Sequence, residues 1–137
     1  MMEIKQFTVN FFGENCYLLY DETKEAVLID CGCMNRQEFS QVEGCITQQQ
    51  LVIKHLLCTH YHVDHLMGAA LVYQQYGLLP EVCQEDTVVL PSVSQQAVMF
   101  GLPNIQETAI GAYLNEGDVI SFGHTKLTVI AVPGHSP

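Results

Sequence analysis

Four residues of types that commonly bind metal ions lie within six positions of the chain: His60, His62, Asp64 and His65. In an extended segment His60 and His62 would point to the same side, so that both imidazoles could reach one ion. If the chain turns helical at Asp64, that carboxylate and His65 would reach a neighbouring position. One tetrahedral ion cannot comfortably use all four, so the spacing favours two adjacent metal positions. Imidazole with carboxylate suits Zn²⁺, with Fe or Mn as alternatives.

The other histidines and cysteines that could bind a metal have simpler structural explanations. His55 lies inside the apolar run before the cluster and is expected to be a satisfied core or edge histidine. His124 lies in an expected Gly-His turn and should be at the surface. Cys31 and Cys33 could bind a soft metal, but the signal is weak without a second pair of cysteines. Cys58, close to the cluster, is expected to fill the core.

The charge balance narrows the classes of partner. The 137 residues include 5 Lys and Arg against 15 Asp and Glu, a formal net charge of −10. Such a field repels a phosphate backbone or an anionic membrane, so the sequence argues against nucleic acid and membrane surfaces as partners. Cations are favoured, above all metal ions. Hydrophobic residues make up 48%, enough to bury the core of one domain.

Cysteine usage and the N-terminal residues bear on the cellular compartment. Four of the six cysteines lie inside or beside apolar runs, where a free thiol behaves as a small hydrophobic group. Glu3, Lys5 and Glu14 interrupt the N-terminus before an apolar signal region could form. The charge-free stretch 87–106 holds two prolines and three glutamines, too polar for a membrane span. We therefore expect free thiols and a cytoplasmic location.

The segments around the metal-binding cluster alternate between strand and helix patterns, which predicts an α/β fold. Strands are expected at residues 4–9, 16–20, 26–29, 51–57, 81–83, 119–122 and 126–132. Helices are expected after Asn35, after the cluster as far as Gly77, and near residues 92–100.

Local signals fix several of these boundaries. Asn35 can cap the first helix, and Glu38 occupies the capping-box position three residues later. Residues 21–24 form a polar turn between two strands, and Gly123 with His124 forms another. The runs 26–29, 51–53 and 127–132 are almost continuously apolar, which is typical of strands buried on both faces.

Taken together, these segments resemble the metallo-β-lactamase-fold hydrolases, most closely the glyoxalase II-like (hydroxyacylglutathione hydrolase-like) branch. The most specific match is THYHVDHLMG at residues 59–68. Weaker matches are NCYLL at 15–19, LIDCG at 28–32, LNEGD at 114–118 and VPGHSP at 132–137. The resemblance therefore extends over nearly the whole chain.

The resemblance implies a specific set of site residues. One metal would be bound by His60, His62 and His135, and the second by Asp64 and His65, with Asp64 as the catalytic residue. Asp30 matches an aspartate that lies beneath the site and supports the ligands, although an ordinary carboxylate in a strand-end turn would fit that position equally well. The family also uses a bridging aspartate and a last histidine downstream of the PGHSP segment. We therefore expect residues 1–137 to form a single, C-terminally incomplete domain with an αββα sandwich architecture.

The function implied by the resemblance is hydrolysis of small esters or thioesters of the S-acylglutathione type by a metal-bound hydroxide. Zinc is the expected metal, with two sites in the family and at most one in this chain. One alternative is an iron-dependent, thiol-oxidising relative of the same fold. The other is a metal-binding fragment without catalysis. Because the family's second sheet would be only partly present, we also expect a homo-oligomer that covers the exposed sheet.

Overall fold

The chain begins with three strands that pair in sequence order, β1 (Glu3–Val9), β2 (Glu14–Tyr20) and β3 (Glu25–Ile29). Both pairings are antiparallel. The computed structural model describes residues 2–10, 13–33, 35–59, 66, 68–83, 95–96 and 110–129, and the structural statements below concern these residues. The metal-binding cluster predicted from the sequence falls between two of the described ranges.

Parallel strands extend the sheet beyond β3. Helix α1 (Arg36–Gln48) leads to β4 (Val52–Leu57), and helix α3 (Ala69–Tyr76) leads to β5 (Pro80–Cys83). With β6 (Ala112–Leu114) the sheet has six strands in the order β1-β2-β3-β4-β5-β6. The pairs β3–β4, β4–β5 and β5–β6 are parallel, and α1 and α3 lie in the connections that lead to β4 and β5.

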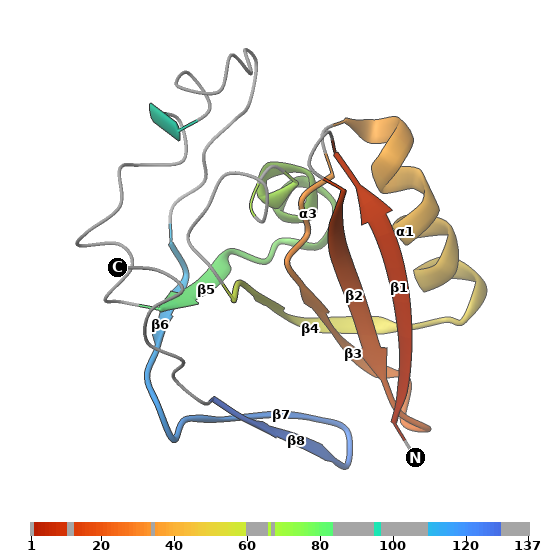
Figure 1. Ribbon diagram of the computed structural model, residues 1–137. Coiled ribbons are helices and arrows are strands. Elements are labelled where there is room, and N and C mark those ends of the chain that lie inside the picture. The colour runs from red at the N-terminus through yellow and green to blue at the C-terminus, as the bar shows by residue number, and fades with distance from the viewer. Residues whose placement is uncertain are drawn as a thin grey trace.

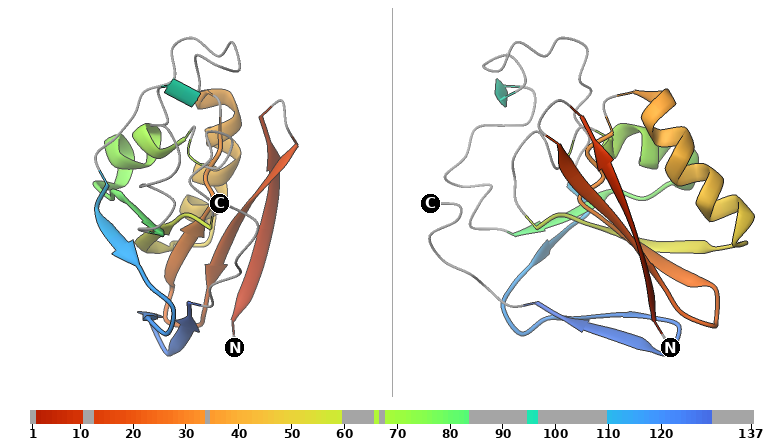
Figure 2. Two further views of the ribbon diagram at one scale, coloured as in Figure 1. Left: turned by 60° about the vertical axis from the view of Figure 1, so that its left-hand side comes forward. Right: turned by 45° about the vertical axis from the view of Figure 1, so that its right-hand side comes forward.

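Two further strands, β7 (Val119–Phe122) and β8 (Thr125–Thr128), form a separate antiparallel hairpin. Helices α1 and α3 lie on one side of the six-stranded sheet, and the hairpin lies on the other (Figures 1 and 2). This mixed sheet with helices confirms the α/β class predicted from the sequence.

The helix boundaries follow the predicted caps. The side chain of Asn35 accepts a hydrogen bond from the backbone N–H of Glu38 (2.9 Å), and Phe39, Val42 and Ile46 are buried on one face of α1. Helix α3 ends at Gly77, whose φ of 72° is left-handed and whose N–H donates to the carbonyl of Tyr73. None of the described helices is long and apolar enough to cross a lipid bilayer.

Some strand predictions need correction. The short strand β6 was not predicted, because Ala-Tyr-Leu is too brief to show alternation. Strand β5 begins at Pro80, one residue earlier than predicted; a first strand position tolerates proline. Strand β8 spans Thr125–Thr128, and residues 130–132 of its predicted range lie outside the described part. Of the predicted helix 92–100, Gln95 and Gln96 are described, and both are helical.

Two separate groups of apolar side chains hold the layers together. The larger lies between the sheet and the helices and includes Leu18, Leu28, Phe39 and Val72, each fully buried. The smaller lies on the opposite face and consists of Leu19, Val27, Leu57, Ile120 and Phe122. Strand β3 is therefore buried on both faces, as predicted, whereas Val52 on β4 is 56% exposed and departs from the prediction for run 51–53.

Candidate metal site

The predicted metal ligands His60, His62, Asp64, His65 and His135 lie outside the described residues. The structure does describe the residues that flank the cluster of four, Thr59 on one side and Leu66 and Gly68 on the other. It also describes Asp30, the remaining predicted site residue. The contacts that hold the chain on both sides of the cluster are therefore known.

Asp30 holds the N-terminal end of that segment. It follows β3 directly with a left-handed φ of 58°, and its backbone N–H donates to the carbonyl of Leu57 on β4 (2.9 Å). Its side chain is buried, and one carboxylate oxygen accepts the backbone N–H of Thr59 (2.7 Å). The other oxygen accepts the Thr59 hydroxyl (2.5 Å). Asp30 therefore fixes the backbone and the side chain of the residue that immediately precedes His60.

Cys31 holds the C-terminal end of the segment. Its carbonyl accepts the backbone N–H of Gly68 (2.9 Å), the residue before α3. A Cβ added at Gly68 would lie 2.8 Å from that carbonyl oxygen, 2.9 Å from the Cys31 thiol and 3.1 Å from the backbone nitrogen of Cys33. Only glycine allows the two backbones to approach so closely. Adjacent residues of one chain segment, Asp30 and Cys31, thus hold both ends of the cluster.

The supporting segment 30–33 is itself held from β1. The side-chain amide of Asn10 donates to the carbonyl of Gly32 (3.0 Å). The backbone N–H of Asn10 donates to the carboxylate of Glu38 at the start of α1 (3.0 and 3.2 Å). Sequence reasoning missed Asn10, because a single polar residue at a strand end carries no signal of a partner 22 residues away.

The buried thiols of this segment fill space. Cys31 and Cys33 are at most 1% exposed, with their sulfurs 3.9 Å apart. A hydrogen bond with the Cys16 thiol, together with burial, raises the pKa of Cys31, and contact with Cys31 and burial raise that of Cys33. Neutral buried thiols are poor nucleophiles and poor ligands. Within the described ranges no three His, Cys, Asp or Glu side chains are placed to hold a metal ion.

The remaining sequence predictions can be checked directly. His55 is partly buried and its Nδ1 lies 2.6 Å from the Glu81 carboxylate on β5, so it is a satisfied histidine, as expected. Cys58 is 3% exposed and belongs to the helix-side core, and His124 is exposed in the hairpin turn. Five cysteines are described with their side chains, and all five are free thiols.

Comparison with known proteins decides the family. The sequence profile of the Metallo-beta-lactamase superfamily matches residues 9–137. The chain belongs to this superfamily. One curated member, hydroxyacylglutathione hydrolase GloC of Haemophilus influenzae, is 31% identical over 140 residues. That match covers 99% of this chain and 63% of the relative, so the chain spans less than two thirds of that protein's length. It supports the glyoxalase II-like branch of the superfamily.

Two solved structures share the fold of this chain. The BLEG-1 B3 metallo-beta-lactamase superposes with a TM-score of 0.81 at 23% identity, covering 98% of this chain and 64% of that one. TTHA1623 in a di-iron-bound form superposes with a TM-score of 0.68 at 24% identity, covering 83% of this chain and 55% of that one. At such identities the likeness establishes the fold.

Metal ions are implied by the superfamily, commonly zinc, and one of these structures carries two irons. The donor set of this chain suits either metal, because imidazole binds both and carboxylate is a common companion ligand. The segment that bears four of the donors is held at both ends by the contacts described above, and such support is typical of metal sites. The residues present therefore fit a metal centre.

Proposed function

We propose that this protein is a metal-dependent hydrolase of small thioesters of the S-acylglutathione class. The observation that carries the proposal is the 31% identity to a hydroxyacylglutathione hydrolase across 99% of the chain. The sequence THYHVDH at 59–65 supplies the metal-binding residue types within that match. The low number of basic residues, 5 Lys and Arg, favours substrates that are not strongly anionic.

Each residue has a defined role in the proposal. His60, His62 and His135 would hold one metal ion, and Asp64 and His65 a second. A bound metal supplies water activated at neutral pH and polarises the carbonyl that is attacked. Asp30 is proposed as a positioning residue, because its carboxylate binds Thr59 through the backbone N–H and the hydroxyl. Displacing reacting groups by about 1 Å can reduce a rate on the order of a hundredfold, so such positioning matters.

The proposal is tested with the protein expressed from its complete reading frame, loaded with zinc or iron and assayed on S-lactoylglutathione. We expect hydrolysis that is abolished by His60→Ala or Asp64→Ala. His124→Ala is the matched control, because that side chain is exposed in the hairpin turn. Wild-type turnover by the His60→Ala variant would show that the metal-hydrolase assignment is wrong.

The thiol-oxidising alternative would use a single iron, and it has a direct test. Elemental analysis of the purified protein identifies the bound metal. An oxygen electrode then measures whether the iron-loaded protein consumes oxygen when given a thiol. We expect thioester hydrolysis without oxygen uptake. Oxygen uptake that depends on His60 would favour the thiol-oxidising function instead.

Residues 1–137 alone should differ from a protein with all the family's ligands. Three histidines and a water can complete one four-coordinate site, whereas Asp64 and His65 alone leave the second incomplete. We therefore propose at most one tightly bound metal per chain of 137 residues, with little or no hydrolysis. Elemental analysis after dialysis checks the stoichiometry, and two metals per chain would contradict the proposal.

A further inference from the structure

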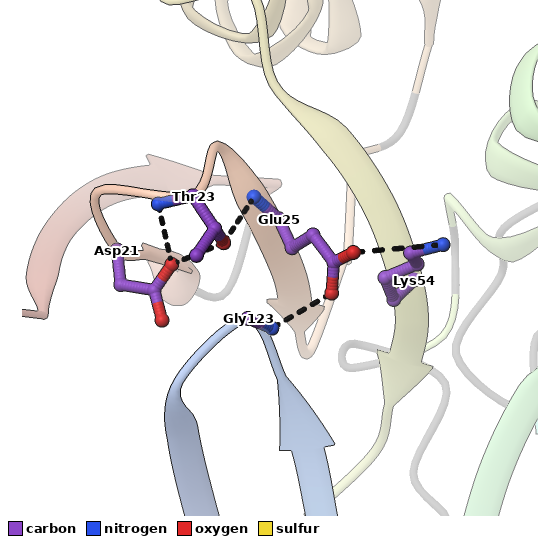
Figure 3. Close-up of polar contacts among 5 residues, drawn as sticks. All are labelled: Asp21, Thr23, Glu25, Lys54 and Gly123. Carbon is purple, nitrogen blue, oxygen red and sulfur yellow. Dashed lines mark hydrogen bonds and ion pairs between the residues drawn. The ribbon is translucent and has the colours of Figure 1, made fainter.

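The β7–β8 hairpin meets the first sheet at a carboxylate in the turn between β2 and β3. Asp21 is 3% exposed, and its side chain accepts hydrogen bonds from two directions. Within its own turn it accepts the Thr23 backbone N–H (3.0 Å) and the Thr23 hydroxyl (2.5 Å), both shown in Figure 3. From the hairpin it accepts the His124 backbone N–H and the Thr125 hydroxyl, both at 2.8 Å. One carboxylate thus joins residues more than 100 positions apart.

A second carboxylate makes a parallel contact. Glu25, the first residue of β3, accepts the backbone N–H of Gly123 (2.7 Å) and lies 3.9 Å from the ammonium of Lys54 on β4 (Figure 3). The Glu25 backbone N–H donates to the Thr23 hydroxyl, so the two carboxylates share one hydrogen-bonded turn. Both consecutive N–H groups of the hairpin turn, at Gly123 and His124, therefore donate to the first sheet.

The shape of the turn fits this contact. Gly123 has a φ of +56°, and a Cβ added there would overlap the Thr23 hydroxyl and both carboxylate oxygens of Asp21. The turn backbone thus lies directly against the acidic turn. Behind the turn, Ile120 and Phe122 are buried on the sheet, and Leu127 and Val129 are partly buried against the same cluster. The polar contacts of the turn therefore add to an apolar contact in attaching the hairpin.

We propose that Asp21, assisted by Glu25, is a latch that docks the β7–β8 hairpin on the six-stranded sheet and thereby positions the chain leading to His135. Strand β8 ends at Thr128, seven residues before this candidate ligand. The positional part of the inference rests on the proposed function, since it assumes that His135 binds metal. The docking part rests on the described contacts alone.

The latch is sensitive to acid, because a protonated carboxyl loses acceptor capacity. The hydrogen bond from the Thr23 hydroxyl, together with that from Thr125 and the two backbone N–H groups, lowers the pKa of Asp21. Charged and titratable groups on the surrounding elements are Glu22, Lys24, Glu25, Lys54, His124 and Lys126. Docking should therefore persist at neutral pH and weaken only in acid.

The test compares the same type of substitution, threonine to valine, at two positions of β8. Thr125→Val removes a donor to Asp21, and Thr128→Val alters an exposed position on the same strand. Hydrogen exchange with mass spectrometry then follows peptides from residues 117–128 and, as an internal reference, from β2 and β3. We expect Thr125→Val to speed exchange in 117–128 about threefold to tenfold, the fold-change that corresponds to one hydrogen bond. Thr128→Val should match the wild type, and exchange in β2 and β3 should not change.

Asp21→Asn should produce a larger increase, because it alters the acceptor of four hydrogen bonds. Equal exchange in Thr125→Val and Thr128→Val would overturn the latch. Hydrolysis of S-lactoylglutathione by the same variants, each expressed from the complete reading frame, tests the positional part: faster exchange with an unchanged rate would overturn it. If the wild type expressed from the complete reading frame hydrolyses nothing, the proposed function fails, and the exchange result still decides the docking.

Discussion

Two buried aspartates, one before strand β3 and one after it, accept similar hydrogen bonds in different surroundings. Asp30, after the strand, accepts an N–H and a hydroxyl from Thr59. Asp21, before it, accepts an N–H and a hydroxyl from Thr23 and a second such pair from the hairpin. Asp30 connects neighbouring strands of one sheet, whereas Asp21 connects two sheets.

The difference lies in what backs each contact. Beside Asp30, Cys31 and Cys58 belong to the large helix-side core. Behind the Asp21 contact, among the described residues, lies the smaller cluster whose buried members are Leu19, Val27, Leu57, Ile120 and Phe122. Local opening free energies scale with buried apolar contact, so the hairpin should open before the six-stranded sheet unfolds. The same carboxylate chemistry thus joins two strands beside the larger core and joins two sheets beside the smaller one.

The largest expected effect on stability comes from replacing a buried phenylalanine by alanine, a change that can be made in each of the two cores. Phe39 and Phe122 are 0% and 1% exposed, on the helix side and the hairpin side respectively. Phe39→Ala should cost roughly 3–5 kcal/mol in the free energy of unfolding, as for buried aromatic residues generally. Phe122→Ala should cost less, because the hairpin can detach while the sheet remains folded. Urea denaturation followed by circular dichroism measures both, and equal losses would mean that the two regions unfold as one unit.

Removing the Asp30 carboxylate should have the next largest effect. Asp30→Ala leaves the N–H and the hydroxyl of Thr59 without this acceptor and should cost roughly 1.5–3 kcal/mol, since hydrogen bonds to charged groups are the stronger ones. Thr59→Val removes the hydroxyl and keeps the N–H, so its cost should be smaller. Chemical denaturation gives the stability, and zinc titration gives the affinity, which should fall in the same order. If zinc affinity is unchanged in Asp30→Ala, the aspartate is an ordinary turn carboxylate.

Two glycine substitutions test the close contact at the end of the cluster. Gly68→Ala places a Cβ against the Cys31 carbonyl and thiol and should destabilise by roughly 1–3 kcal/mol through overpacking. Gly44→Ala is the matched control on α1, where a Cβ meets nothing within 4 Å. That change should stabilise by about 0.5–1 kcal/mol, because alanine favours helix. Thermal melting measures both, and a neutral Gly68→Ala would show that the chain relaxes at this point.

The smallest effect is the pH dependence of the hairpin joint. The pKa of Asp21 is lowered in the folded protein, so its stabilising contribution is fully present above the unfolded value of about 3.9. The contribution is lost as the pH falls further, through the folded value. We expect the melting temperature of the wild type to fall more steeply below about pH 4 than that of Asp21→Asn. Glu116→Gln, at an exposed turn position, is the control, and parallel pH profiles for Asp21→Asn and wild type would contradict the prediction.

The sequence was sufficient where local rules decide the structure. Asn35 caps α1, Gly77 ends α3 and the Gly123-His124 turn joins β7 to β8, all as predicted from residue type and spacing. The superfamily could also be predicted from local motifs, because the residues of THYHVDH are contiguous in the sequence at 59–65. The metal-binding roles of its residues stay predictions.

Long-range partners could not be predicted. The turn at 21–24 has the composition of any polar surface turn, and nothing in it indicates that Asp21 binds a hairpin more than 100 residues later. Val52 has the apolar type of a buried strand residue, yet its position on β4 leaves it exposed. Asp30 was predicted from its motif, but its partner Thr59 becomes evident only when β3 and β4 lie side by side.

Strand β3 should tolerate insertion less than substitution. Its central residues Ala26, Val27 and Leu28 are 0% exposed and pack on both faces of the sheet. Adding one residue would reverse the faces of every side chain beyond it and shift Asp30 relative to Asp21 by about 3.3 Å. Such a change would alter the position of Thr59, which precedes the candidate metal ligands, and the docking of the hairpin at the same time. Length variation among homologous chains is therefore expected in the loops outside β3, while the spacing between these two aspartates stays constant.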